Sequence, residues 1–123
     1  MLDQAQLIAF AATLDGAAAR VFYEGKLGLK VVSDDPFALA LDANGTMLRI
    51  QKVQHFTPPP FTALGWQVPD IRGTIDALRG AGIELERFPG MTQDERGIWQ
   101  APSGALIAWF KDPDANVLSL TQL

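Results

Sequence analysis

The chain has 123 residues, of which 48% are hydrophobic and 20% charged, a composition typical of one soluble globular domain with a real hydrophobic core. It contains no cysteine, which excludes disulfides, thiolate ligands and a cysteine nucleophile and is compatible with the cytoplasm. The net charge of -4 and the lack of a Lys/Arg stripe argue against nucleic acid as a partner. No apolar run is long enough to span a membrane, and no basic segment precedes Asp3, so we expect neither a membrane partner nor a signal peptide.

Residues 6–53 are predicted to form a first βαβββ unit. An apolar run at 6–13 predicts a strand, and Asp15 follows as the N-cap of a helix over residues 17–27. The helix has one apolar face, and Gly28 supplies its end. Three more strands are expected at residues 29–33, 37–41 and 46–53, the last two joined by the hairpin signal Asn44-Gly45.

Residues 61–121 are predicted to repeat this order after a Pro-rich linker at residues 54–60. Asp70 is the expected cap of the second helix, and residues 83–85 are expected to begin the next strand. Aligning Asp15 with Asp70 brings Gly28 to within one residue of Gly82. A duplication explains this match better than chance does. We therefore expect a single domain over residues 1–123, built from two repeated units.

The segment Asp112-Pro113-Asp114-Ala115-Asn116, followed at once by the apolar-alternating run at 117–120, predicts a closing hairpin. Together with Phe22-Tyr23, Leu27-Gly28-Leu29 and the internal repeat, it resembles the vicinal oxygen chelate superfamily, which includes glyoxalase I, bleomycin-resistance proteins and extradiol dioxygenases. The resemblance covers nearly the whole chain. It implies an α+β fold, in which the duplicated βαβββ units form a curved eight-stranded mixed sheet around a cleft on the concave side.

The resemblance also identifies four positions at which metal-dependent members hold their ligands. Here they are occupied by Ile8, Arg49, Ala63 and Ser119. Two of these side chains are apolar, Arg49 is a permanent cation, and serine alone is a poor ligand. In other members a glutamate usually stands at the position of Ser119, and a glycine at that of Ala115. We therefore expect a member of the superfamily with no metal and no cofactor.

The concave face is expected to bind a small organic molecule. Period-two alternation on the last strand of each unit sets the polar side chains on the face opposite the core. Arg49 is the leading partner for an anionic group, because its guanidinium can bind a carboxylate in a two-pronged geometry. The alternative is that Arg49 crosses a solvated sheet edge or pairs with a nearby acid. The expected ligand-binding residues are Phe10, Arg49, Gln51, Gln67, Glu95, Trp99 and Ser119.

Residues 89–97 are polar and bounded by glycines, which predicts a loop. Either the loop folds over the pocket mouth and brings Met91, Glu95 or Trp99 to the ligand, or it is solvated with Trp99 in the core. Trp109 and Phe110 lie on opposite faces of one predicted strand, so one of them should point into the pocket; the sequence does not say which.

Three functions remain open on the sequence alone. We favour a metal-free small-molecule binding or sequestering protein of the bleomycin-resistance type, which would be a homodimer. The second is a glyoxalase-like lyase, isomerase or dioxygenase-related enzyme that works without the usual metal, with Arg49 polarising an anion and Glu95 carrying a proton. No nucleophile–base pair supports it, so catalytic residues are not assigned and the balance favours a protein that is not an enzyme. The third is a dimeric interaction module. The ligand itself, small and either anionic or aromatic, is not identified by fold analogy.

Overall fold

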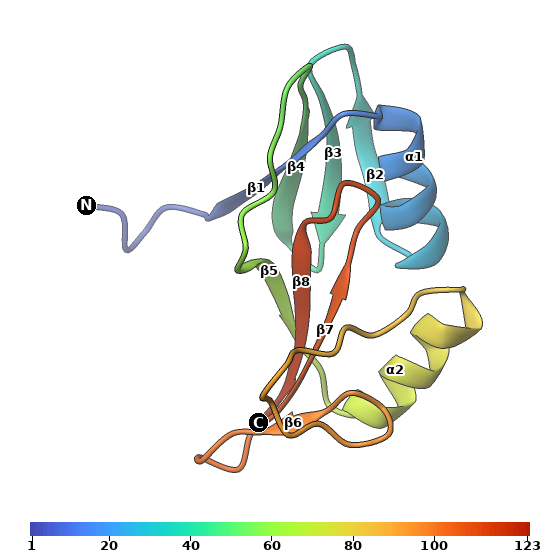
Figure 1. Ribbon diagram of the computed structural model, residues 1–123. Coiled ribbons are helices and arrows are strands. Elements are labelled where there is room, and N and C mark those ends of the chain that lie inside the picture. Colours follow the sequence, from blue (N-terminus) through green and yellow to red (C-terminus); the bar gives the residue numbers. More distant parts are fainter. The chain divides into compact units, whose positions relative to one another are not determined.

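The computed structural model describes all residues, 1–123. The chain divides into two compact units, Met1–Pro58 and Pro59–Leu123, and each contains one four-stranded sheet (Figure 1). The predicted α+β class and the repeated βαβββ order are confirmed. The eight strands belong to two mixed sheets of four, in place of one continuous sheet. That the two units make up a single domain stays a prediction.

The first unit has the order expected from the sequence. It comprises β1 (Ile8–Thr13), α1 (Gly16–Arg20), β2 (Lys30–Asp34), β3 (Ala38–Ala43) and β4 (Thr46–Lys52). The strand order across the sheet is β1-β4-β3-β2, with β1 parallel to β4 and the other pairs antiparallel. The sheet therefore has β1 and β2 at its edges.

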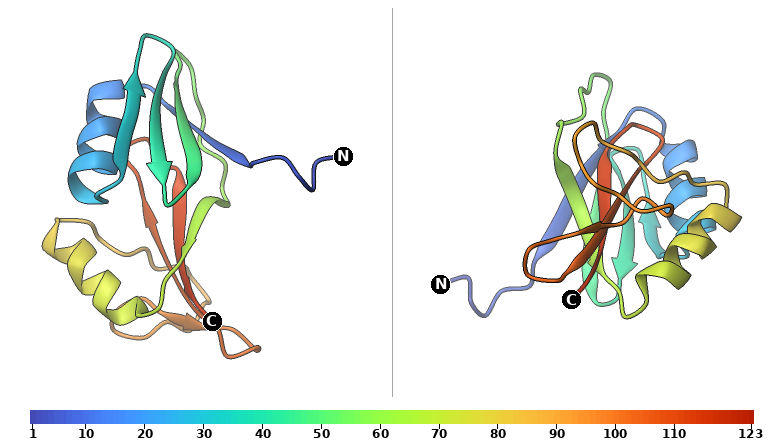
Figure 2. Two further views of the ribbon diagram at one scale, coloured as in Figure 1. Left: turned by 180° about the vertical axis from the view of Figure 1, so that it is seen from behind. Right: turned by 60° about the horizontal axis from the view of Figure 1, so that its bottom comes forward.

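The helix of the first unit differs in one respect from the prediction over 17–27. It begins as expected, because the side chain of Asp15 accepts a hydrogen bond from the backbone N–H of Ala18 at 3.1 Å. After Arg20 the chain continues as a π-helical segment, η1 (Val21–Lys26). The helix covers one face of the sheet (Figures 1 and 2), and Phe22 and Tyr23 are buried beneath it. The opposite face carries no helix of this unit.

The second unit repeats the order with a shorter edge strand. Its elements are β5 (Thr62–Gln67), α2 (Ile71–Gly80), β6 (Trp99–Gln100), β7 (Leu106–Lys111) and β8 (Val117–Gln122). The strand order is β5-β8-β7-β6, with β5 parallel to β8. The predicted cap is confirmed, since Asp70 accepts a hydrogen bond from the N–H of Gly73 at 3.1 Å. Ile71, Ile75 and Leu78 of α2 are buried, with Phe110 and Leu118 in the same core.

The prediction that a strand begins at residues 83–85 was wrong, because no strand lies between α2 and β6. Only an isolated bridge joins Leu85 to Phe110, and the edge strand β6 starts at Trp99. The intervening backbone is bonded through a side chain: the amide of Gln93 donates to the carbonyls of Glu86 and Gly97 and accepts from the N–H of Phe88. These bonds satisfy polar groups that a strand ladder would otherwise pair.

The closing hairpin is confirmed, and its turn is organised by one buried carboxylate. Asp112 is 6% exposed, and its Oδ1 accepts hydrogen bonds from the N–H groups of Asp114 and Asn116, each at 2.9 Å. The Nδ2 of Asn116 donates to Oδ2 of Asp112 at 2.7 Å. Ala115 takes a positive φ of 65° within this turn. The turn joins β7 to β8, so it fixes the register of the central strand pair in the second unit.

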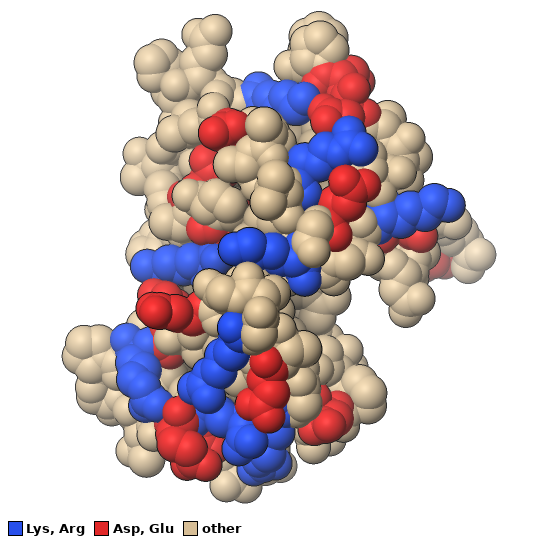
Figure 3. Space-filling view, turned by 90° about the vertical axis from the view of Figure 1, so that its right-hand side faces the viewer, with Lys and Arg blue, Asp and Glu red and all other residues tan.

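Acidic and basic side chains are interspersed over the side of the molecule shown in Figure 3. The protein also forms ion pairs between opposite charges, such as Arg20 with Glu24 and Arg96 with Asp76. This side therefore offers no broad area of one sign. None of the helices combines the length and the apolar character needed to cross a bilayer.

Candidate functional site

The helix-free face of the first sheet brings together three of the expected site residues. Phe10 on β1 is the register partner of Arg49 on β4, and Arg49 is in turn the partner of Ala40 on β3. Gln51 lies two residues further along β4, on the same face. Phe10 is 51% exposed, whereas Ala40 is buried. The first unit thus presents a cation between an aromatic ring and a small apolar side chain.

Arg49 is half-buried, and its side chain forms no hydrogen bond or ion pair with another residue of the chain. The positive charge of Arg49 acts on the carboxylate of Asp35. The pKa of Asp35 is lowered mainly by hydrogen bonds from the N–H groups of Phe37 and Ala38, and to a smaller degree by the charge of Arg49. The other basic residue nearby, Lys52, is paired with Asp34. Arg49 is therefore a cation with its donors free, on a partly apolar surface.

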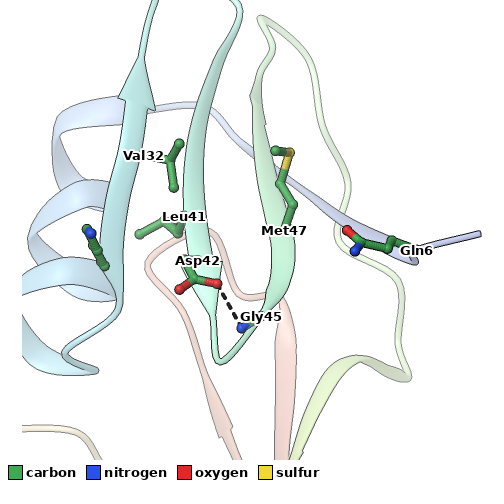
Figure 4. Close-up of a pocket in the computed structure, with 7 residues that line it drawn as sticks. Gln6, Val32, Leu41, Asp42, Gly45 and Met47 are labelled. Carbon is green, nitrogen blue, oxygen red and sulfur yellow. Dashed lines mark hydrogen bonds between the residues drawn. The ribbon is translucent and has the colours of Figure 1, made fainter.

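A cavity of about 300 Å³ lies in the first unit (Figure 4). Val32 of β2, Asp42 of β3 and Met47 of β4 line it, together with Gln6 from the segment before β1. Arg49 is not among its lining residues, which are Gln6, Lys30, Val32, Leu41, Asp42, Gly45 and Met47. Met47 precedes Arg49 by two residues on β4, so the two side chains lie on the same face in adjacent rows.

The second unit presents an aromatic cluster on the helix-free face of its sheet. Trp109 is the register partner of Ser119, and its ring lies 5.5 Å from that of Phe88 and 6.3 Å from that of Trp99, measured between centroids. The Nε1 of Trp109 donates to the hydroxyl of Thr62 at 3.2 Å. Phe110, by contrast, is 1% exposed and stacks on Trp66 in the core. Of this pair, Trp109 is the residue on the helix-free face.

Gln67, Ser119 and Trp99 also belong to this face of the second sheet. Ser119 pairs with Gly65, and Gln67 pairs with Thr121; Trp99 pairs with Ile107, which is itself opposite Thr121. A Cβ on Gly65 would lie 2.6 Å from the Oγ of Ser119. The glycine therefore leaves the space that the Ser119 hydroxyl occupies.

The loop that carries Glu95 is tied to α2. Arg96 forms two hydrogen bonds to the carboxylate of Asp76 on α2, and Arg79 of α2 donates to the carbonyl of Glu95 at 3.1 Å. The carboxylate of Glu95 is 81% exposed and lies 3.8 Å from the guanidinium of Arg96. The backbone here is held beside the helix, whereas Trp99 lies on the opposite side of the sheet. A ligand role for Glu95 stays a prediction that these contacts do not strengthen.

The four positions that correspond to metal ligands offer almost no donor atoms to a metal ion. In the first unit Ile8 supplies no donor atom and Arg49 supplies only positive charge; in the second unit Ala63 supplies none and Ser119 one hydroxyl. The structure contains no group of three or more His, Cys, Asp or Glu side chains that could hold a metal ion. These residues do not fit a divalent metal, and no chemistry is assigned through one.

Sequence reasoning missed the cavity of the first unit and its two charged residues. Lys30 and Asp42 lie twelve residues apart in the chain and become neighbours only through the register of β2 and β3. The strand prediction at residues 29–33 also did not include the shift in register between Val31 and Ser33. Of the three aromatic residues in the cluster of the second unit, Phe88, Trp99 and Trp109, only Trp99 was among the residues predicted to bind the ligand.

Comparison with known proteins agrees with this architecture. Residues 6–120 match the model of the family described as the Glyoxalase/Bleomycin resistance protein/Dioxygenase superfamily. No curated protein sequence gave a significant match.

Three solved structures illustrate the similarity of fold. A putative glyoxalase family protein from Bacillus anthracis is 18% identical, with a TM-score of 0.76 over 99% of this chain and 98% of that one. A bleomycin resistance determinant encoded on the transposon Tn5 is 21% identical, with a TM-score of 0.75 over 95% and 96%. TnmS3, an antibiotic binding protein from Streptomyces sp. CB03234, is 22% identical, with a TM-score of 0.72 over 99% and 98%. The chain therefore belongs to the glyoxalase/bleomycin resistance protein/dioxygenase superfamily.

Proposed function

We propose that this protein binds and sequesters a small anionic aromatic molecule, without a metal ion, and that Arg49 is the partner of the anionic group. The observation that carries the proposal is the half-buried residue Arg49, whose guanidinium has no hydrogen-bonded or ion-paired partner in the chain. A charge withdrawn from water without a partner costs free energy, and a ligand carboxylate would offset that cost. The bidentate geometry of a guanidinium suits a carboxylate in particular.

The surroundings of Arg49 support an aromatic ligand. Phe10 is exposed beside it, and an aromatic ring of the ligand could stack on this side chain. Ala40 and Ala38 on the neighbouring strand are small, so the surface beside the guanidinium is not filled by a large side chain. Gln51 supplies an amide that could bond a further polar atom of the ligand.

The class of function is supported by the family. Two of the similar structures are a bleomycin resistance determinant and an antibiotic binding protein. Binding without chemistry also agrees with the residues at the metal-ligand positions, which offer too few donors for a divalent ion. The proposal includes a homodimer and a cytoplasmic location, the latter in keeping with the lack of cysteine.

Substitution of Arg49 tests the anion site. Binding of 2-naphthoate and of its uncharged amide would be measured by calorimetry for the wild type, Arg49→Met and Arg72→Met. Arg72 is an exposed arginine on α2 and serves as the matched control. We expect Arg49→Met to weaken naphthoate binding by about tenfold or more, which corresponds to one charge-assisted hydrogen bond. Thermal stability should be equal to that of the wild type or higher, because the substitution removes an unpaired charge. Equal losses in both variants, or equal affinity for the uncharged amide, would contradict the role of Arg49.

The metal-free part of the proposal is tested separately. Elemental analysis of the protein as purified, before and after treatment with a chelator, should give far less than one equivalent of zinc, nickel, iron or manganese per chain. Close to one equivalent of a transition metal, removable by the chelator, would overturn it and would leave the role of Arg49 to be judged on its own experiment.

A further inference from the structure

The cavity of the first unit contains two opposite charges that do not pair with each other. Lys30 on β2 and Asp42 on β3 are register partners, so their side chains emerge on the same face of the sheet. Oppositely charged cross-strand neighbours commonly close into an ion pair, but no ion pair joins these two. Both line the cavity of about 300 Å³.

Both the carboxylate of Asp42 and the ammonium of Lys30 can form further hydrogen bonds. The Oδ1 of Asp42 accepts a hydrogen bond from the N–H of Gly45 at 2.8 Å, which closes the β3–β4 hairpin (Figure 4). Its second oxygen accepts no hydrogen bond from the chain. The ammonium of Lys30 donates none. The cavity therefore offers one anionic acceptor and one cationic donor, carried by neighbouring strands.

Two apolar side chains line the cavity together with these charges. Val32 is 57% exposed and Met47 is 38% exposed, and both line the cavity. Val32 is the extra residue at the shift in register between Val31 and Ser33, and a bulge of this kind re-aims a side chain. Figure 4 shows Val32 directed toward β3, and Met47 on β4 at the other side of β3.

We infer that this cavity is a second binding site, distinct from Arg49, for a small zwitterion with an apolar chain, the chemistry of an aliphatic α-amino acid. The ammonium of the ligand would bond the free oxygen of Asp42, and its carboxylate would bond Lys30. The aliphatic chain would rest on Val32 and Met47. The volume is at the lower end of the range of about 300–1,000 Å³ found for ligand pockets, which suits a molecule of this size.

Three related probes separate the contributions. L-leucine carries both charges, 4-methylpentanoate lacks the amine, and 3-methylbutylamine lacks the carboxylate. Each would be titrated into the protein labelled with ¹⁵N, with the amide signals of Gly45 and Met47 as reporters. Because Lys30 and Asp42 remain exposed to solvent, each charge is expected to contribute modestly, so we expect each analogue to bind about fivefold more weakly than leucine.

Two variants and a control complete the test. Lys30→Gln and Asp42→Asn should each reduce the affinity for leucine by about fivefold. Asparagine keeps an oxygen that can accept from Gly45, so the hairpin should be preserved. Lys26→Gln, at an exposed lysine of η1, should bind leucine as the wild type does. Equal binding of leucine and its two analogues, unchanged affinity in both cavity variants, or signals of Gly45 and Met47 that do not move would overturn the inference. None of these outcomes depends on naphthoate binding at Arg49.

Discussion

Ala115 occupies a backbone conformation that ordinarily favours glycine. Its φ is 65°, and the left-handed region costs an L-residue with a Cβ roughly 1–2 kcal/mol. Glycine would remove that cost but would lose more entropy on folding. We expect Ala115→Gly to raise the free energy of unfolding by about 0.5–1 kcal/mol, measured by urea denaturation.

The matched control for this change is Ala43→Gly at the end of β3, where φ is not positive. Glycine there should lower the free energy of unfolding, because glycine has more conformational freedom than alanine in the unfolded state and loses it when the strand forms. The opposite signs of the two alanine-to-glycine changes are the diagnostic result. A loss of stability in Ala115→Gly equal to that in Ala43→Gly would refute the strain argument.

Arg49 shows what can be predicted for a single residue. Its face on β4 follows from the alternation with Leu48 and Ile50, which are both buried. Whether an acid reaches it depends on residues distant in the chain. Asp35 is near enough for the charge of Arg49 to lower its pKa, but its carboxylate accepts hydrogen bonds from the N–H groups of Phe37 and Ala38. Only the folded arrangement decided that Arg49 has no partner.

Asp34 joins three elements of the first unit. Lys52 of β4 and Arg20 of α1 both donate hydrogen bonds to its carboxylate on β2. These bonds lower the pKa of Asp34 below its ordinary value of 3.8, with Lys52 the larger cause. Because the folded pKa is lowered, the stabilisation is fully present above the unfolded-state pKa and is lost as pH falls through the folded value.

We therefore expect Asp34→Asn to be less stable than the wild type at pH 7, with the difference shrinking as the pH falls below about 3.8. Thermal unfolding from pH 7 to pH 2 would measure it, and added salt should reduce the difference at pH 7. Glu84→Gln, at an exposed carboxylate without an ion pair, is the control and should follow the wild type throughout. A gap between Asp34→Asn and the wild type that does not change with pH would contradict the ion-pair explanation.

The conformation of the segment between residue 83 and β6 was the hardest to predict from the sequence. Its apolar start resembles a strand, but Leu85 makes only one bridge to Phe110. Gln93 and Asp94 then hold the loop through bonds to backbone groups, among them those from the N–H groups of Arg96 and Ile98 to Asp94. Such side-chain-to-backbone bonds compete with strand pairing and have no periodic signature in a sequence.

A homodimer is expected for the molecule as a whole. The first sheet has β1 at an edge, and Leu7 and Ile8 are 75% and 45% exposed there. An open edge with exposed apolar side chains is protected when two chains pair. Sedimentation at micromolar concentration should show a species of twice the chain mass of 13.3 kDa.

Two substitutions locate the interface. Leu7→Glu should shift the equilibrium toward the single chain, because a buried carboxylate without a partner opposes association. Val21→Glu, at a position that is 62% exposed on the helix side, should leave it unchanged. A wild-type protein that sediments only as the 13.3 kDa species would count against the dimer.

The sequence by itself determined the features that depend on near neighbours. The caps at Asp15 and Asp70, the Asp112 turn and the alternation along β4 and β8 are local, because the interacting groups lie within a few residues of one another. Family membership followed from the same features and from the repeat.

Only the tertiary structure decided which groups meet across strands. Strand register explains three features of the structure. It places Lys30 opposite Asp42, it sets the face of the sheet on which Trp109 lies, and it leaves Arg49 without an acidic partner. A shift of one residue in register turns every side chain of a strand to the opposite face. Local propensities leave the register between distant strands open, since it is set by the packing of the core as a whole.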